Sequence, residues 1–181
     1  MKRLFPIFMC ICLFVGCKGN EVTDTALALR SAVLQAKSCS FTAEITADYG
    51  DMTYSFTMDC VADDQGNVSF TVTKPETIAG ITGKLTADGG SVTFDDTALA
   101  IPMLTDDQIT PVSAPWILMR TLRGGYITSC TDGRITIDDS YENDALKLDI
   151  ALDNDNRPAL AEIYWKNRRI LTVEVTSFAL S

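Results

Sequence analysis

The sequence predicts an α+β fold that is mainly antiparallel β, with about ten strands, an N-terminal helix and a central apolar helix. Apolar and polar residues alternate almost without a break from Ser40 to Pro75, which is the two-residue period of strands with one wet face. Turn residues such as Gly50-Asp51 separate the runs. One segment, from Asp106 to Gly125, clearly interrupts the alternation. It contains the apolar run that predicts the central helix.

The first 17 residues have the features of a bacterial export signal. Lys2 and Arg3 precede a twelve-residue apolar stretch, residues 4–15, which is too short for a membrane span of about 20 residues and matches a secretory signal. The run Leu13-Phe14-Val15-Gly16-Cys17 resembles the lipobox of bacterial lipoprotein signal peptides, except that Phe14 is bulkier than the pattern expects. The resemblance implies that Cys17 receives a diacylglyceryl group and becomes the first mature residue. The alternative is an ordinary secretory signal in which the cysteine stands by chance.

These features divide the chain into three parts. We expect a lipoprotein signal peptide at residues 1–16, a lipidated tether at 17–21 and a single domain at 22–181. Because two acyl chains anchor a protein stably and one does so only marginally, a diacylglyceryl Cys17 would hold the domain at the extracytoplasmic face of the cell membrane. At about 3.5 Å per extended residue, the short tether keeps the domain close to the lipid surface.

Charge and residue usage exclude several classes of function. Lys2 and Arg3 leave with the signal, so 13 of the 15 basic residues remain against 24 acidic ones, and the mature net charge is −11. Such an acidic chain disfavours binding to nucleic acid, whose phosphates need neutralising, and electrostatic binding to anionic lipid. The chain has no histidine, which removes Ser-His-Asp and Cys-His catalysis and histidine metal sites. We predict a protein that is not an enzyme and that uses no metal or cofactor.

The segment from Val22 to Lys37 predicts the N-terminal helix. Apolar residues such as Leu29 and Val33 recur at helical spacing. Thr23 or Asp24 can cap the helix.

Three cysteines follow Cys17 in the chain: Cys39, Cys60 and Cys130. They contain no CxxC pair, which argues against a zinc ribbon or a thioredoxin motif. A two-residue turn at Gly50-Asp51 would place Phe41 opposite Cys60, with Cys39 on a diagonal of the same face. Cys39 and Cys60 are therefore the candidate disulfide, and three small buried thiols are the alternative.

The central helix is expected to begin at Ser113, to have Pro115 near its first turn and to end at Gly124-Gly125. A helix that is apolar on most sides needs contacts on more than one side. Its apolar residues include Trp116, Ile117, Leu118, Met119 and Leu122.

The order of elements is a helix, a long meander, a mid-chain helix and more meander, and it resembles that of the lipoprotein-carrier (LolA/LolB-like) superfamily. Three stretches carry the likeness. A strand ends at Thr73-Lys74-Pro75, a hairpin joins residues 85–90 to Val92-Thr93-Phe94, and a closing pair joins residues 157–163 to 171–178. None of the residues in these motifs is catalytic.

The resemblance implies an unclosed half-barrel, with the central helix against the concave face and an apolar cavity that takes acyl chains. It implies a protein that binds or carries an acyl chain, a lipid or a lipidated ligand. Two alternatives stay open: a solid core without a ligand, and a cell-surface interaction or sensor module with an envelope protein as its partner. The cavity-lining residues that the resemblance implies are Trp116, Ile117, Met119, Leu122, Ile78 and Ile81.

Acidic clusters are interpreted as turns. Asp63-Asp64, Asp95-Asp96, Asp106-Asp107 and Asp138-Asp139 fall at expected strand ends, where Asp accepts backbone hydrogen bonds. Paired carboxylates for acid–base catalysis are the less favoured alternative. The run 153–156 lacks the glycine and the distant glutamate of a calcium-binding EF-hand loop. The arginines expected on a solvated rim, rather than on phosphate groups, are Arg120, Arg123, Arg168 and Arg169.

Overall fold

The structure is a computed structural model, and it describes most of the chain beyond the expected signal. The expected signal peptide lies outside the described residues, and so does most of the expected tether with Cys17. The described residues are 21–95, 97–101, 104–105, 108–139 and 146–181.

Two α-helices, two short 3-10 helices and thirteen strands make up the described part of the chain. In chain order they are α1 (Glu21–Gln35), β1 (Ser38–Asp48), β2 (Thr53–Asp63), β3 (Val68–Lys74), η2 (Glu76–Ile78), β4 (Thr82–Thr86), β5 (Gly89–Phe94), β6 (Thr97–Ile101), β7 (Leu104–Thr105), β8 (Gln108–Ile109), η3 (Pro111–Ser113), α2 (Ala114–Gly124), β9 (Tyr126–Thr131), β10 (Arg134–Asp138), β11 (Leu146–Leu152), β12 (Pro158–Trp165) and β13 (Arg168–Leu180).

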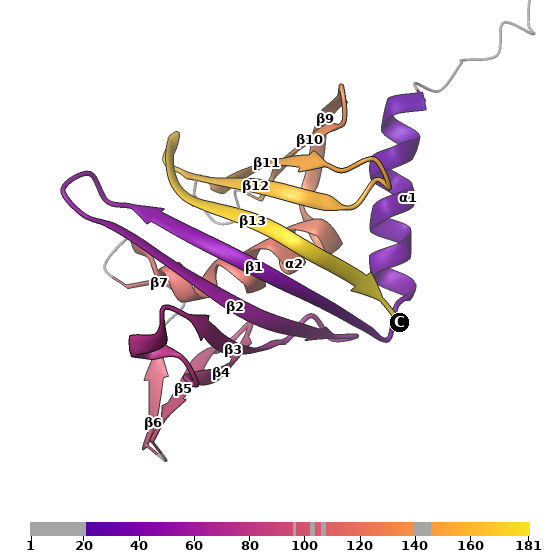
Figure 1. Cartoon of the computed structure of the whole chain (residues 1–181). Coiled ribbons are helices and arrows are strands. Elements are labelled where there is room, and N and C mark those ends of the chain that lie inside the picture. Colours follow the sequence, from indigo (N-terminus) through magenta and orange to yellow (C-terminus); the bar gives the residue numbers. More distant parts are fainter. Residues whose placement is uncertain (1–20, 96, 102–103, 106–107, 140–145) are drawn as a thin grey trace, which may run out of the picture.

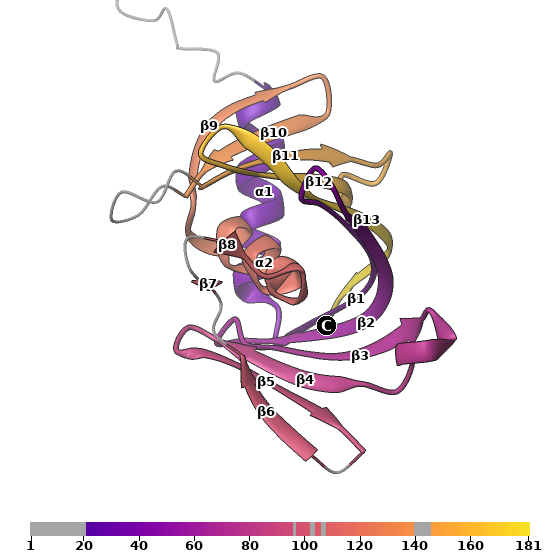
Figure 2. The same cartoon turned by 90° about the vertical axis from the view of Figure 1, so that its left-hand side faces the viewer.

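Eleven of the strands form one antiparallel sheet that curves around α2 (Figures 1 and 2). Their order is β6-β5-β4-β3-β2-β1-β13-β12-β11-β10-β9, and each neighbouring pair is antiparallel. The sheet does not close, since β6 and β9 stand at its two ends. Helix α1 contacts β9 and α2 at one end of the curve. The predicted α+β half-barrel is therefore confirmed.

The first and last strands lie together in the middle of the sheet, where β1 pairs with β13. The chain end is tied to the start of β1. The Ser181 carbonyl oxygen accepts hydrogen bonds from the Lys37 and Ser38 N–H groups at 2.7 and 3.0 Å. The C-terminus therefore lies directly beside the end of α1 (Figure 1).

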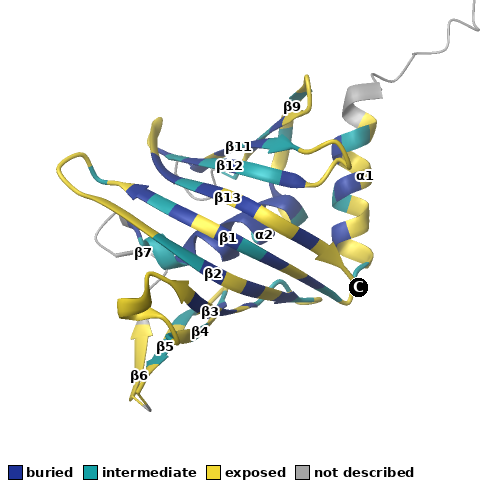
Figure 3. Ribbon diagram, viewed as in Figure 1, coloured by how far each residue is buried: buried dark blue, intermediate teal, exposed yellow. Residues whose placement is uncertain are grey.

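Burial alternates along the central strands, as the period-two pattern predicts (Figure 3). The convex face carries polar contacts such as the hydrogen bond from the Thr42 hydroxyl to Asp59 Oδ1 at 2.8 Å. The concave face carries the core. Its contributions from β1 are Cys39, Phe41, Ala43, Ile45 and Ala47.

Helix α2 occupies the interior of the curve, as predicted. Its C-terminus is capped by the N–H of Gly125, which donates to the carbonyl oxygen of Thr121 at 2.9 Å. A glycine is needed there because an added Cβ would lie only 2.5 Å from Ile137 Cγ2. Ser113 stands at the N-cap, but its hydroxyl donates backwards to the Thr110 carbonyl oxygen at 2.6 Å and does not cap the helix.

Two details differ from the prediction. Helix α1 begins at Glu21 and ends at Gln35, so Thr23 and Asp24 lie inside its first turn and are not its cap. The small β7–β8 hairpin lies next to and inside the segment that was expected to hold only the central helix, because strands of two residues are too short to show an alternation.

The predicted Cys39–Cys60 disulfide is not formed, because both residues are free thiols. The predicted register is confirmed: Phe41 lies opposite Cys60, and Cys39 lies opposite Ala62. The two sulfurs are therefore on a diagonal, where side chains stand farther apart than the Cβ separation of about 3.8 Å that a disulfide needs.

Burial sets the reactivity of these thiols. It raises the pKa of Cys39 and of Cys60 to about 12, so only about one thiol in ten thousand is a thiolate at pH 8. Cys130 is half-buried. We expect iodoacetamide to label Cys130 in the folded chain and to label Cys39 and Cys60 only after unfolding in guanidinium without reductant, as read by peptide mass spectrometry. A Cys39–Cys60 pair that stays unlabelled after unfolding, and is released by reductant, would contradict the free thiols.

Candidate functional site

Side chains of α2 lie buried in the core beneath the sheet. Trp116 is only 8% exposed, and Ile117, Met119 and Leu122 are buried in the same core cluster. Of the other residues implied as cavity lining, Ile81 is half-buried against the core. Ile78 lies in η2 at the surface and is 36% exposed. The structure therefore places four of the six in the packed core.

Two arginines join α1 to α2 in opposite directions. Arg30 of α1 donates from Nε to the Leu122 carbonyl oxygen at 2.8 Å and from Nη2 to the Gly125 carbonyl oxygen at 2.6 Å. Arg123 of α2 donates from Nη1 to the Val33 carbonyl oxygen at 3.3 Å. The last carbonyls of a helix have no hydrogen-bond donor within the helix, so Arg30 supplies donors to the carbonyls at the end of α2. Burial lowers the pKa of Arg30, but a guanidinium stays charged.

The expectation that Arg123 belongs to a solvated rim is wrong. Besides its bond to α1, its Nη2 donates to the Asp64 carbonyl oxygen at 2.6 Å, so this side chain links α2 to both α1 and the β2–β3 turn. Arg168 and Arg169 do lie at the surface, where they pair with Asp48 and Glu162.

Arg120 joins α2 to the end of β10. Its Nε lies 3.3 Å from Asp139 Oδ2, and its guanidinium lies over the Trp116 ring at 5.2 Å. Thr121 donates its hydroxyl to the same carboxylate oxygen at 3.3 Å. Burial raises the pKa of Asp139, although Arg120 and Thr121 act to lower it. Through these contacts the carboxylate positions the helix.

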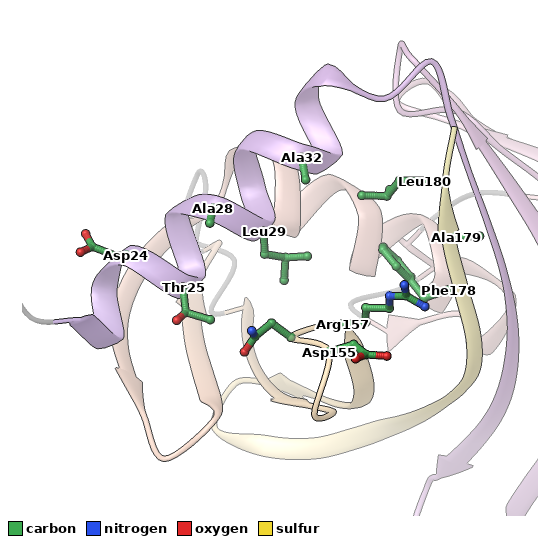
Figure 4. A pocket seen from close by; sticks show the side chains of 11 residues that line it. Asp24, Thr25, Ala28, Leu29, Ala32, Asp155, Arg157, Phe178, Ala179 and Leu180 are labelled. Carbon is green, nitrogen blue, oxygen red and sulfur yellow. The ribbon is translucent and has the colours of Figure 1, made fainter.

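A groove opens between α1 and the end of β13, with a volume of about 650 Å³ (Figure 4). We call it the α1 groove. The buried side chains of Leu29 and Phe178 form its floor, and Leu29 points from the helix into the space (Figure 4). The complete lining is Asp24, Thr25, Ala28, Leu29, Ala32, Asp155, Asn156, Arg157, Phe178, Ala179 and Leu180.

Small residues on α1 leave room for the groove. Ala28 and Ala32 stand one turn apart on its wall. Phe178 is held from behind, since its ring packs against Phe41 with the centroids 6.2 Å apart. The helix side of the α1 groove is therefore lined by small side chains, and on the sheet side the position of Phe178 is fixed by its packing against Phe41 in the core.

The opposite rim is the turn between β11 and β12, which is held by its own hydrogen bonds. Asp153 Oδ1 accepts from the N–H groups of Asp155 at 2.9 Å and of Arg157 at 2.8 Å. The Asn156 N–H donates to the Asp153 carbonyl oxygen at 3.0 Å. This rim carries the charged side chains of Asp155 and Arg157.

An apolar floor below a charged rim suits a ligand with an aliphatic part and a polar head. The volume of the α1 groove lies within the range of about 300–1,000 Å³ that is typical of small-molecule sites. Asp24 and Asp155 offer negative charge at the mouth, and Arg157 offers positive charge. The groove can therefore bind an amphiphile without any catalytic group.

The interpretation of acidic residues as turn formers is confirmed for Asp63 and Asp153. Asp63 Oδ1 accepts from the N–H groups of Gln65 and Asn67 at 3.0 and 2.9 Å. Burial acts to raise its pKa, but the hydrogen bonds from Asn67 and Gln65 outweigh it and the pKa is lowered. Asp96 and the pair 106–107 lie outside the described residues. In the part that is described, no three His, Cys, Asp or Glu side chains gather closely enough to hold a metal ion.

Sequence reasoning missed both Arg30 and the α1 groove. The partners of Arg30 are backbone carbonyls, which carry no sequence signature. A weak signal existed, since Arg30 follows Ala26 by four residues and so shares a face with a buried residue.

Comparison of the sequence with known proteins identifies no family: no family model matches it, and no curated protein matches it. Within the described residues, no helix is both long and apolar enough to cross a membrane.

Solved structures resemble the chain over most of its length. A domain described as outer membrane lipoprotein-sorting, from Vibrio parahaemolyticus, is 10% identical, with a TM-score of 0.50 over 89% of this chain and 92% of that one. A LolA superfamily protein from Nitrosomonas europaea is 10% identical, with a TM-score of 0.43 over 86% and 93%. The lipoprotein LppX from Mycobacterium tuberculosis is 13% identical, with a TM-score of 0.42 over 87% and 93%. At these identities the likeness concerns the fold alone, and the chain shares the fold of the Vibrio parahaemolyticus domain.

The arginine exchange between the helices predicts a stability effect. Replacing Arg30 by Ala leaves buried carbonyls of α2 without donors, which costs about 1–3 kcal/mol in the free energy of unfolding. Arg30→Lys should recover only part of this, because an ammonium lacks the planar fork that reaches two carbonyls. Guanidinium denaturation of the full chain measures both effects.

Arg168→Ala is the matched control. Its pair with Asp48 is exposed and 3.9 Å long, so its removal should change stability by less than about 0.5 kcal/mol. If Arg30→Ala is as mild as Arg168→Ala, the exchange does not hold the helices together.

Proposed function

We propose that the chain is a lipid-anchored lipoprotein of the extracytoplasmic membrane face that binds an acyl chain of a lipid or lipidated ligand in the α1 groove. The observation that carries the proposal is the apolar floor of this groove, built by Leu29 and Phe178 between α1 and β13. Burying an acyl chain is worth about 0.8 kcal/mol per methylene, so a chain that is only partly enclosed still gains useful affinity. The LolA-like fold supports the proposal at the level of architecture alone.

The position of the groove on α1 suits a ligand that arrives from a membrane. The groove runs along α1 from Asp24 to Ala32, so one end of the groove lies at the first turn of the helix, which begins at Glu21. Cys17 precedes Glu21 by four residues, or about 14 Å of extended chain. A diacylglyceryl Cys17 would therefore hold the mouth of the groove near lipid head groups.

A second candidate is a protein–protein interaction or sensor lipoprotein without a lipid ligand. The observation that favours it is the filled interior, in which Trp116, Leu118 and Met119 occupy the concave face. In this case the α1 groove is a surface feature, and binding to an envelope protein is the function.

Filling the groove tests the first proposal. Ala32→Trp places an indole in the groove, and it should weaken the binding of a fluorescent fatty acid by the purified full chain by at least tenfold, because the aliphatic part loses its site. Leu27→Trp is the matched control, since Leu27 lies on α1 as an exposed residue outside the groove. Fluorescence titration measures the dissociation constants.

Native mass spectrometry also distinguishes the two candidates. If the acyl-chain proposal holds, the chain extracted from membranes in mild detergent should show a co-purified lipid that Ala32→Trp removes. A wild-type chain that carries and binds no lipid, or variants that bind alike, would refute the acyl-chain proposal and leave the interaction module.

The anchor has its own test. Radiolabelled palmitate should enter the wild-type chain in growing bacteria, and Cys17→Ala should abolish both this incorporation and membrane retention, because the thioether to diacylglycerol cannot form. Cys130→Ala serves as the control and should keep the label. Incorporation that persists in Cys17→Ala would contradict the anchor.

A further inference from the structure

The rim of the α1 groove carries charges of both signs. Asp155 and Arg157 stand two residues apart on the turn between β11 and β12, across the groove from α1 (Figure 4). Asp24 lies on the helix side, in the first turn of α1. Among the described residues of the lining, these are two carboxylates against one guanidinium, a net charge of −1. The head group of a bound amphiphile would meet this rim, because the apolar part lies on the floor below it.

The turn holds the backbone of both rim residues in place. The N–H groups of Asp155 and Arg157 donate to Asp153 Oδ1 at 2.9 and 2.8 Å. Between them, Asn156 has a φ of 59°, a conformation that asparagine adopts more readily than most residues. A negative and a positive side chain are therefore presented from neighbouring positions of one fixed turn.

The charge balance disfavours a purely anionic head group. A phosphate is bound by cationic donors, and the rim offers one of these, Arg157, beside the two carboxylates of Asp24 and Asp155. The net charge of −9 on the whole chain adds to the repulsion. A head group that carries a cation as well as a phosphate can instead satisfy both signs of the rim.

The lining also distinguishes between kinds of cation. A quaternary ammonium has no N–H group to donate and is typically recognised by aromatic faces. Phe178 is the one aromatic residue among the described residues of the lining, and it is only 6% exposed in the floor. A primary ammonium has three N–H donors, which suit the carboxylate of Asp155 and the amide oxygen of Asn156. The rim therefore favours a primary ammonium.

We propose that the ligand of the α1 groove is a zwitterionic phospholipid whose head group joins a phosphate to a primary ammonium, as in phosphatidylethanolamine. This inference rests on the proposed acyl-chain function and names its ligand. Arg157 binds the phosphate, and Asp155 accepts hydrogen bonds from the ammonium. The acyl chain lies on the floor formed by Leu29 and Phe178.

Competition between single-chain lipids tests the head group. The purified full chain is loaded with the fluorescent fatty acid, and lysophospholipids with the same acyl chain are added below their micelle concentrations. The ethanolamine form should displace the probe at a concentration about fivefold lower than the choline and glycerol forms, which is a factor that a solvent-exposed charge pair can supply.

Two variants assign the two charges. Asp155→Asn should bring the ethanolamine form to the level of the choline form, because the negative charge that distinguishes them is lost while Asp153 still holds the turn. Asp132→Asn is the matched control, since Asp132 is an exposed carboxylate on the β9–β10 turn, outside the groove lining. Arg157→Gln should weaken all three lysophospholipids alike and leave the binding of an uncharged monoacylglycerol unchanged.

The outcomes separate this proposal from the acyl-chain function. Equal displacement by the three lysophospholipids, a preference for the glycerol form, or an ethanolamine preference that survives in Asp155→Asn would overturn the head-group proposal, while binding of the probe still supports the acyl-chain function. A chain that does not bind the probe would refute the acyl-chain function and the head-group proposal with it.

Discussion

The structure depends on the burial of one helix, α2, in the curve of the sheet. An antiparallel sheet with one apolar face must cover that face, and an eleven-stranded sheet offers more of it than an 11-residue helix can cover. The middle of the sheet therefore wraps around α2, where Leu118 and Met119 are among the most deeply buried side chains. At the ends of the sheet, α1 contacts β9, and no second described strand pairs with β6.

Helix α1 is attached through polar contacts to α2 and by an apolar stripe to the core. Arg30 and Arg123 exchange hydrogen bonds between the two helices, and Leu29 and Val33 supply the stripe. Because Ala28 and Ala32 are small, the helix does not fill the space toward β13, and the α1 groove remains there. The packing of α1 thus leaves an apolar opening beside this helix, near the expected membrane tether.

Much of the fold was predictable from the sequence, because its strongest signals are local. The alternation of Phe41, Ala43 and Ile45 reports a one-sided strand, and the Gly50-Asp51 turn fixes its register with β2. The groove was not predictable in the same way. Its floor is formed by Leu29 and Phe178, which lie far apart in the sequence. The helix side of the groove is lined by alanines, which have no distinctive chemistry. The predicted register already sets Cys39 opposite Ala62, two residues from Cys60, so the Cys39–Cys60 disulfide needed a change in turn length that the structure does not have.

The central claim is that α2 fills the interior and that an acyl chain enters beside α1. A crystal structure of the chain with a bromine-labelled fatty acid tests this claim most directly, because anomalous scattering locates the bromines without reference to the protein density. The account predicts bromine peaks between α1 and β13, close to Leu29 and Phe178. Peaks among the side chains of α2, with Trp116 displaced from the core, would contradict it.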